Sequence, residues 1–349
     1  MRFVCDRSFE TQARKIIAES PLAIEISVIS AGKLRRYKHF RFVDYITTPS
    51  IVWNNLIDSA KTVWGFFESV GIILRFKPDV VFAKGGFVCL PMGFAAKVLG
   101  IPLVIHDSDA RPGLTNRLLA PYARAIATGY PLENYTYSVE KTFYTGVPIR
   151  SGYRRLSKSD TVKVKQSLGF DSTKPLMVAM GGGLGAATIN RAVLEAAPEF
   201  IAANLQVLLI AGAKQYKKIL EEAHPYTSHV KVVDFVSTGM HEVLGAADIV
   251  LSRASATALQ ELAVLGTPTI AVPSRALADQ HKNAAVYAAH NAAIDMTDDR
   301  LEAGELASVV TALIRDVPKR EKLSRAIHSL AKPHAARDTA LLIRDNAKR

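Results

Sequence analysis

Short hydrophobic runs alternate with segments of helical periodicity along almost the whole chain. The runs lie at residues 22–30, 78–86, 101–109, 123–130, 141–148, 176–183, 205–213, 230–236, 247–254 and 267–274. Strands that alternate with helices of about 10 to 15 residues are typical of parallel sheets covered by helices on both faces. The pattern therefore predicts an α/β fold made of two Rossmann-like, doubly wound parallel-sheet domains that face a cleft.

The length and the turn residues predict where the chain divides. A chain of 349 residues is too long for one typical core. Residues 148–160 are rich in turn residues and positive charge, and Pro333 interrupts a helical pattern near the end. We therefore expect an N-terminal domain at 1–150, a C-terminal domain at 151–330, and a last helix at 331–349 that returns to the first domain.

Charge and composition narrow the classes of partner. The formal net charge of +12 is compatible with nucleic acid, an anionic membrane surface or a phosphorylated substrate. The positive charge is spread over both halves without an aromatic-interleaved basic motif, which argues against nucleic acid. No uninterrupted apolar stretch reaches membrane-spanning length and the first residues lack a signal-peptide pattern, so we expect a cytoplasmic protein. Two cysteines without a Cys/His cluster predict no structural zinc.

Small residues follow the hydrophobic run that ends at Leu251. Residues 254–257 stand at the start of a predicted helix, where exposed N–H groups can bind an anion such as a diphosphate. Farther along that helix, Glu261 is placed to accept two hydrogen bonds from a ribose diol. Gln280, after the next strand, offers a donor and an acceptor to sugar hydroxyls. Together these residues predict a site for a nucleotide-sugar donor.

Glycine turns follow predicted strands in both halves. Residues 180–186 (MGGGLGA) precede a predicted helix, but the dinucleotide fingerprint is incomplete. A phosphate-binding turn and a simple strand-to-helix turn both remain open for this segment. No acidic residue about 20 positions beyond either turn completes the pattern of a dinucleotide oxidoreductase.

Several polar residues follow strands in the first half. Gly85 and Gly86 end one predicted strand, and His106, Asp107 and Asp109 stand at the carboxyl end of the next. Ligands of open α/β sheets bind at that edge. A neighbouring carboxylate favours the protonated form of a histidine and suits it to proton transfer. A purely structural histidine is the alternative interpretation.

Residues 50–76 form a long predicted helix with an apolar face. That face carries Trp53, Ile57, Ala60, Trp64, Phe67 and Leu74, and the preceding segment carries Lys33, Arg35, Arg36, Lys38 and Arg41. An apolar face beside a basic cluster fits peripheral binding to an anionic leaflet. A helix packed on its own sheet, with a solvated basic loop, is the competing interpretation.

The order of these motifs resembles the MurG family, bacterial transferases that add N-acetylglucosamine to the lipid-linked muramyl-pentapeptide precursor of peptidoglycan. The resemblance covers nearly the whole chain and rests on AKGGFVCLP, IPLVIHDSDARPGLTN, TGVPIR, GGGLGAATIN, SRASATALQELAVLGTPTIAVPS and DQHKNA. It implies a GT-B fold whose C-terminal domain binds UDP-N-acetylglucosamine and whose N-terminal domain binds the undecaprenyl-diphosphate-linked acceptor. It also implies a peripheral location on the cytoplasmic face of the cell membrane.

The resemblance implies a role for individual residues of this chain. Arg150 would approach the diphosphate, Gly183 would line the donor site and Val236 would contact the uracil through its backbone. The donor helix would contribute Ala256, Thr257, Ala258, Leu259, Gln260 and Glu261, with Glu261 on the ribose and Gln280 on the sugar. On the acceptor side it implies Gly85, Gly86, His106, Asp107 and Asp109. No pair of metal-binding carboxylates stands out, so we expect neither a metal nor another cofactor.

The chain departs from the family pattern at three places. Gly183 stands where the family usually has Ser, and Asp109 stands where it usually has Asn. The third departure is that the usual first strand and its histidine-bearing glycine loop do not occur, and residues 1–17 resemble the family's second strand and following helix. We hypothesise that Met1 is an internal methionine of a longer reading frame. With the loop histidine absent, His106 is the remaining candidate for the catalytic base.

The sequence is compatible with more than one function. The main prediction is an inverting, metal-independent N-acetylglucosaminyltransferase. A UDP-N-acetylglucosamine 2-epimerase shares the two-domain architecture but needs no lipid acceptor. A catalytically impaired homologue that binds the donor, or that docks other wall-synthesis proteins on the membrane, is a further alternative.

Overall fold

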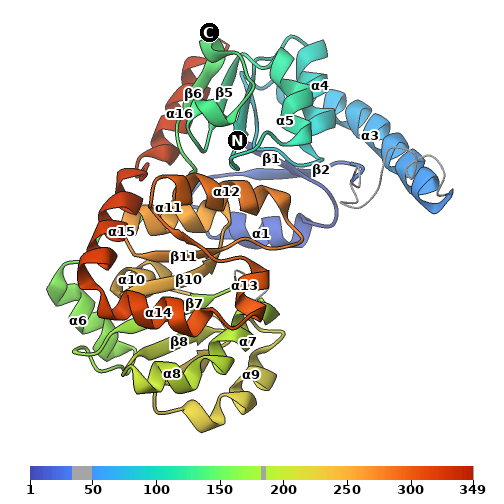
Figure 1. Cartoon of the computed structure of the whole chain (residues 1–349). Helices are drawn as coiled ribbons and strands as arrows, with labels where there is room; N and C mark the ends of the chain where they lie inside the picture. The colour runs from blue at the N-terminus through green and yellow to red at the C-terminus, as the bar shows by residue number, and fades with distance from the viewer. Residues whose placement is uncertain (34–48, 182–185, 349) are drawn as a thin grey trace. The chain divides into compact units, whose positions relative to one another are not determined.

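The computed structural model describes residues 1–33, 49–181 and 186–348, and it forms two compact units (Figure 1). Unit 1 comprises residues 1–107, 112–144 and 337–349. Unit 2 comprises residues 108–111 and 145–336. Every strand pair in both units is parallel, so the predicted fold class is confirmed. The main division, at residues 144–145, lies a few residues before the boundary expected from the sequence.

Unit 2 contains one six-stranded sheet in the order β12-β11-β10-β7-β8-β9. Its strands are β7 (Leu176–Met180), β8 (Gln206–Ile210), β9 (Val230–Val233), β10 (Ile249–Arg253), β11 (Thr269–Val272) and β12 (Ile294–Asp295). Numbered from its first strand, this is the 3-2-1-4-5-6 order of dinucleotide-binding folds. All residues of β7 and β8 are buried, as expected for strands covered on both faces.

Helices cover both faces of this sheet (Figure 1). They are α6 (Lys158–Ser167), α7 (Ala187–Glu195), α8 (Ala197–Ala202), α9 (Tyr216–Glu222), α10 (Met240–Ala246), α11 (Ala256–Leu265), α12 (Ala278–Ala289), α13 (Asp298–Glu302), α14 (Leu306–Arg315) and α15 (Val317–Ser329), with a 3-10 turn at His224–Tyr226. On one face α7, α8 and α14 bury Ile189, Phe200 and Val310 against β7, β8 and β10 in the main hydrophobic core.

Unit 1 contains two parallel sheets that share no strand pair among the residues that the structure describes. One sheet pairs β1 (Arg2–Cys5) with β2 (Glu25–Val28), and the other has β3 (Val81–Ala83), β4 (Leu103–Asp107), β5 (Ala125–Thr128) and β6 (Thr142–Tyr144) in that order. The helices are α1 (Glu10–Ala18), α3 (Pro49–Phe76), α4 (Cys89–Val98), α5 (Leu114–Leu119) and α16 (Ala335–Asp345), with 3-10 turns at Ala120–Tyr122, Leu132–Asn134 and Val139–Lys141. The additional first strand expected from the family pattern stays a prediction.

Helix α3 buries a side that combines small, polar and apolar residues, and it exposes a separate apolar side. Asp58, Gly65, Ser69 and Ile73 are buried, and a Cβ added to Gly65 would lie 1.8 Å from the backbone oxygen of Ser30. This close approach leaves space only for glycine at that position. All six residues of the predicted apolar face are exposed, including both tryptophans at 63%. The alternative in which this face packs on its own sheet is therefore wrong for this structure.

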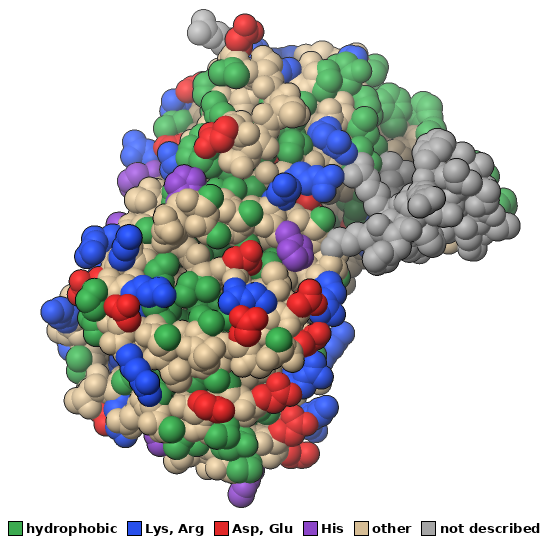
Figure 2. Space-filling view, in the orientation of Figure 1, with side chains coloured by type: hydrophobic (Ala, Val, Ile, Leu, Met, Phe, Trp, Pro, Cys, Tyr) green, Lys and Arg blue, Asp and Glu red, His purple; other side chains and the backbone are tan. Residues whose placement is uncertain are grey.

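Surface side chains are distributed differently on the two units. Figure 2 shows hydrophobic side chains gathered on unit 1 near α3, whereas acidic and basic side chains are interspersed over the visible face of unit 2. Although α3 has 28 residues, no helix within the described ranges is both long and apolar enough to cross a membrane. Most of the basic segment before α3 lies outside the described residues; of its predicted cluster only Lys33 is described, and it lies over the ring of Phe87.

Gly146, in the TGVPIR segment, combines a positive φ with close packing. Its φ is +87°, a conformation that side chains with a Cβ rarely adopt. A Cβ at this position would lie 2.3 Å from Cβ of Lys332 and 3.2 Å from Cβ of Ala335. The backbone at Gly146, four residues before Arg150, therefore packs closely against Lys332 and the first residue of α16, Ala335.

We predict that Gly146→Ala lowers the free energy of unfolding by about 2 kcal/mol or more, because backbone strain and a steric clash add. Gly304→Ala is the matched control, since Gly304 also has a positive φ, of +79°, but nothing lies within 4 Å of an added Cβ. Denaturant unfolding followed by circular dichroism measures both variants. Equal destabilisation of the two would contradict the packing argument.

Candidate active site at the carboxyl edge of the unit 2 sheet

The strand order of unit 2 reverses between β7 and β10. Met180, the last residue of β7, is in register with Ser252 of β10. In open α/β sheets, ligands bind beyond the carboxyl ends of the strands at such a switch point. The end of β7 and the start of α11 after β10 therefore share one edge. Gly183, predicted to line the donor site, lies outside the described residues.

Helix α11 begins with an N-cap at this edge. Ser255 is extended, and its Oγ accepts a hydrogen bond from Ala258 N–H at 3.3 Å. The small residues Ala256 and Thr257 follow, and N–H groups in the first turn of a helix have no intrahelical acceptor. Together with the helix dipole, these groups favour an anion at the end of β10.

The predicted donor residues of α11 occupy different sides of the helix. Leu259 and Gln260 are buried, and the backbone N–H of Leu259 donates to Ser255 O at 3.0 Å. Gln260 Nε2 is also buried and has no hydrogen-bond partner in the described part of the chain. These two residues belong to the packed side of α11. Thr257 is exposed, while Ala258 and Glu261 are half-buried.

Glu261 lies in a cluster with Tyr153 and Arg150. Burial raises the pKa of Glu261, while a hydrogen bond with Tyr153 and the charge of Arg150 act in the opposite direction. Burial also raises the pKa of Tyr153, and the neighbouring Glu261 carboxylate raises it further, so its hydroxyl keeps its proton at neutral pH and donates a hydrogen bond to Glu261. The structure thus brings two predicted donor residues, Arg150 and Glu261, into one polar cluster, and it adds Tyr153.

Gln280 lies in the first turn of α12, where its Oε1 accepts a hydrogen bond from Ser274 N–H at 2.9 Å. This contact fixes the carboxamide relative to the end of β11. One turn later, fully buried Asn283 accepts a hydrogen bond from Ala110 N–H at 2.8 Å and donates to Asp109 Oδ1 at 2.9 Å. Asp109, predicted for the acceptor side, therefore packs within unit 2 against the start of α12.

Four predicted acceptor-side residues lie in unit 1. Gly85 and Gly86 both have positive φ in the turn after β3. His106 is fully buried in β4, and its backbone oxygen accepts a hydrogen bond from Asn116. Asp107 is buried beside it, and its carboxylate accepts hydrogen bonds from Gly113 N–H at 3.2 Å and Tyr137 OH at 2.5 Å. These bonds hold the start of α5 and Tyr137, a structural task for Asp107.

Other features of the candidate site lie farther along the chain. Val236, predicted to contact the uracil, is half-buried in the loop after β9, beside the exposed Phe235. In the described ranges, no three His, Cys, Asp or Glu residues are grouped so that they could hold a metal ion. Sequence reasoning missed Tyr153, Arg253 and Asn283. An Arg at the end of a buried hydrophobic strand was the available signal for Arg253.

Comparisons with known proteins agree with this architecture. The glycosyltransferase family 28 N-terminal domain matches residues 10–128, and the family 28 C-terminal domain matches residues 176–338. The MurG structure of Acinetobacter baumannii superposes with a TM-score of 0.72 and 20% identity over 98% of this chain and 90% of that chain. A UDP-GlcNAc 2-epimerase from Neisseria meningitidis superposes with a TM-score of 0.60 and 12% identity over 99% of each chain. The fold and the matched domains define a GT-B glycosyltransferase.

Curated relatives specify the family. The UDP-N-acetylglucosamine–N-acetylmuramyl-(pentapeptide) pyrophosphoryl-undecaprenol N-acetylglucosamine transferase of Thermoanaerobacter sp. is 34% identical over 82% of this chain and 81% of its own length. The protein of the same name from Legionella pneumophila is 30% identical over 94% and 85%. The chain belongs to this family of transferases, the MurG family.

We predict a pH-dependent stability effect at Glu261. Because its pKa is raised in the folded state, the ionised carboxylate disfavours folding, and stability falls as pH rises from about 4.3, the ordinary value, through the folded pKa. Glu261→Gln removes this penalty, so its melting temperature relative to the natural chain is expected to be higher at pH 7.5 than at pH 4. Thermal melts at both pH values test this, with the exposed Glu199→Gln as control. If the melting temperatures of Glu261→Gln and the natural chain differ by the same amount at both pH values, the prediction is wrong.

Proposed function

We propose that this chain transfers N-acetylglucosamine from UDP-N-acetylglucosamine to the lipid-linked muramyl-pentapeptide precursor, as the names of its relatives state for those proteins. The observation that carries the proposal is the donor-type site of unit 2, at the strand-order reversal beside the capped start of α11. Arg150 and Glu261 lie together there. The sequence similarity, which covers most of the chain and of its relatives, supports the same reaction.

Each group of the donor has a proposed partner. The N–H groups at the start of α11 and the guanidinium of Arg150 bind the diphosphate and stabilise the negative charge that develops as UDP leaves. The Glu261 carboxylate, held by Tyr153, accepts hydrogen bonds from the ribose hydroxyls. Gln280 contacts the N-acetylglucosamine, and the backbone at Val236 contacts the uracil. Gly183 lines this site in the same proposal.

The reaction is an in-line displacement. A sugar hydroxyl of the acceptor attacks the anomeric carbon, the bond to the diphosphate breaks, and a base takes the hydroxyl proton. Attack from the side opposite the leaving group inverts the anomeric configuration. His106 stays the proposed base, and since it is fully buried here, direct proton transfer requires that it gain access to the acceptor. Gly85 and Gly86 are proposed to line the acceptor side.

The epimerase alternative rests on the fold alone. Solved UDP-GlcNAc 2-epimerases share the architecture at low identity. The curated relatives with higher identity are named as transferases, which favours transfer to an acceptor. A donor-binding homologue without transfer is the other alternative, and an assay with acceptor separates all three.

We infer that α3 docks on an anionic membrane surface at the cytoplasmic face, where the lipid-linked acceptor resides. Trp53, Trp64 and Phe67 are each more than half exposed on one apolar side. Tryptophan favours the interfacial region of a bilayer, and burial of such a face combines with attraction between the net positive chain and anionic lipids.

We predict that the purified chain transfers labelled N-acetylglucosamine from UDP-N-acetylglucosamine to the muramyl-pentapeptide acceptor, and that Gln280→Ala lowers kcat/KM by about tenfold or more through loss of sugar contacts. Gln166→Ala, which truncates an exposed glutamine on α6, is the matched control and keeps the natural value. Chromatography of the labelled lipid measures the product. UDP binding without transfer indicates the donor-binding homologue, and epimer formed without acceptor indicates the 2-epimerase.

We also predict that replacing Trp53 and Trp64 by Ser lowers partitioning to vesicles with about one-third anionic lipid by at least tenfold, because each buried indole contributes roughly 1.5–3 kcal/mol. Vesicle co-sedimentation measures this. Val139→Ser is the control, since Val139 is 74% exposed on unit 1 outside α3. If the double variant partitions like the natural chain, α3 is not the docking face.

A further inference from the structure

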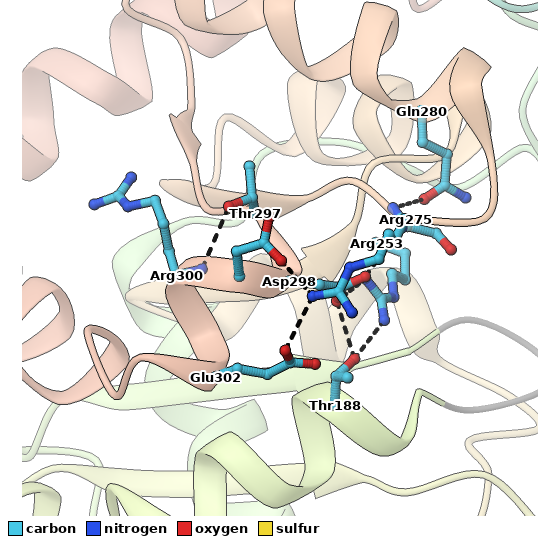
Figure 3. A network of polar contacts seen from close by, with 10 residues as sticks. Thr188, Arg253, Arg275, Gln280, Thr297, Asp298, Arg300 and Glu302 are labelled. Carbon is cyan, nitrogen blue, oxygen red and sulfur yellow. Dashed lines mark hydrogen bonds and ion pairs between the residues drawn. The ribbon is translucent and has the colours of Figure 1, made fainter. Parts of the chain in front are cut away.

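A buried ion pair spans the strand-order reversal of unit 2 (Figure 3). Arg253, the last residue of β10, donates from Nη1 to Asp298 Oδ1 at 2.7 Å and from Nη2 to Thr188 Oγ1 at 2.6 Å. Thr188 Oγ1 in turn donates to Asp298 Oδ1 at 3.0 Å. The side chains of Arg253 and Asp298 are only 13% and 7% exposed. The side chains of Thr188, Arg253 and Asp298 thus each contact the other two, and we call this group the polar triangle.

Each member of the triangle comes from a different part of the site. Thr188 lies in the first turn of α7, directly after the glycine turn, and Arg253 lies two residues before the N-cap Ser255. Asp298 begins α13, and its other oxygen accepts a hydrogen bond from Arg275 N–H at 3.0 Å. Arg275 follows Ser274, whose N–H donates to Gln280. The network therefore connects three segments of the proposed donor site: the start of α7, the end of β10 before α11, and the loop before α12.

The surroundings of Asp298 favour its ionised form. Burial raises its pKa, but hydrogen bonds from Arg275 N–H and Arg253, together with the Arg253 charge, lower it overall. A buried network in which every charge and hydrogen-bonding group has a partner holds its side chains in one arrangement. Removing one partner of a buried ion pair leaves the other charge buried without compensation.

We propose that Arg253 and Asp298 are positioning residues of the donor site, which hold the start of α7 and the loop before α12 in fixed places beside the end of β10. This inference rests on the proposed function, since it takes the donor to bind at this edge. Binding groups have to be held within about 0.5 Å of their productive positions by the packing and hydrogen bonds of the residues that support them. A network of this kind is therefore expected to control donor affinity without touching the donor.

Direct phosphate binding by Arg253 is the competing role. Both terminal nitrogens of its guanidinium are occupied by Asp298 and Thr188. If Arg253 bound phosphate, it would first have to leave Asp298 and Thr188. A variant that weakens these contacts would then bind the donor more tightly. The two roles therefore predict opposite effects for one conservative change, Asp298→Asn.

The same strands provide a matched control at their other end. Lys165 Nζ lies 2.6 Å from Asp248 Oδ2, and this carboxylate also accepts a hydrogen bond from Leu176 N–H at 2.9 Å. Asp248 immediately precedes β10, and Leu176 begins β7. The Asp248 carboxylate thus joins α6 and the start of β7 to the start of β10, at the edge opposite the proposed donor site. We expect its loss to lower stability without affecting the donor segments.

We predict that Asp298→Asn raises the KM for UDP-N-acetylglucosamine and the Kd for UDP by about tenfold, with kcat changed less than about threefold. Thr188→Val, a milder change that keeps the ion pair, is expected to give a smaller shift in the same direction. Arg253→Met combined with Asp298→Asn is expected to be far from additive, because both remove one network. Asp248→Asn is expected to lower the melting temperature while leaving both constants within about twofold of the natural values.

Steady-state kinetics, isothermal titration with UDP and thermal melts on the full chain measure these quantities. Unchanged or tighter UDP binding by Asp298→Asn overturns the proposal, and tighter binding identifies Arg253 as a phosphate ligand. An equal rise of KM in Asp248→Asn also overturns it, since general destabilisation then explains the effect. If Gln280→Ala leaves the KM unchanged as well, the donor site itself is misplaced, which separates failure of the proposed function from failure of this inference.

Discussion

Parallel pairing of β7 with β10 is the contact on which the geometry of unit 2 depends. From β7 the chain proceeds outward to β8 and β9, and from β10 it proceeds in the opposite direction to β11 and β12. Helix α7 is the next helix after β7, and α11 begins soon after β10. Ligands of open α/β sheets bind at this carboxyl edge, next to such a reversal of strand order.

A surface helix of a soluble protein normally turns its large apolar side chains toward the core, whereas α3 exposes many of them to solvent. Gly65 lets the helix approach the backbone near Ser30 very closely, and Ile73 is buried in the core, whereas Trp53, Trp64 and Phe67 are exposed. Surface of this kind is costly in water and is retained where another phase or partner covers it. The net positive charge of the chain adds attraction for anionic lipid.

Much of the fold and part of the site were predictable from the sequence. Alternation of hydrophobic runs with helical segments predicted the parallel sheets, because strands buried on both faces leave continuous apolar runs. The start of a helix near residues 254–257 also followed from local pattern. Contacts between distant residues did not: Arg253 and Asp298 are 45 positions apart, and nothing local indicates that they pair. Likewise, the sequence position of Asp109 beside His106 suggested a shared site, whereas Asn283 holds Asp109 within unit 2.

The attachment of residues 108–111 to unit 2 bears on how this fold can be divided and recombined. Asn283 is fully buried, and two of its partners, Asp109 and Ala110, come from a loop between β4 and α5, which otherwise belong to unit 1. A donor half that began at residue 145 would leave the amide of Asn283 without those partners at the start of α12. Exchange of this unit between relatives therefore has to carry the short loop as well, because the structural unit comprises two separate stretches of the chain.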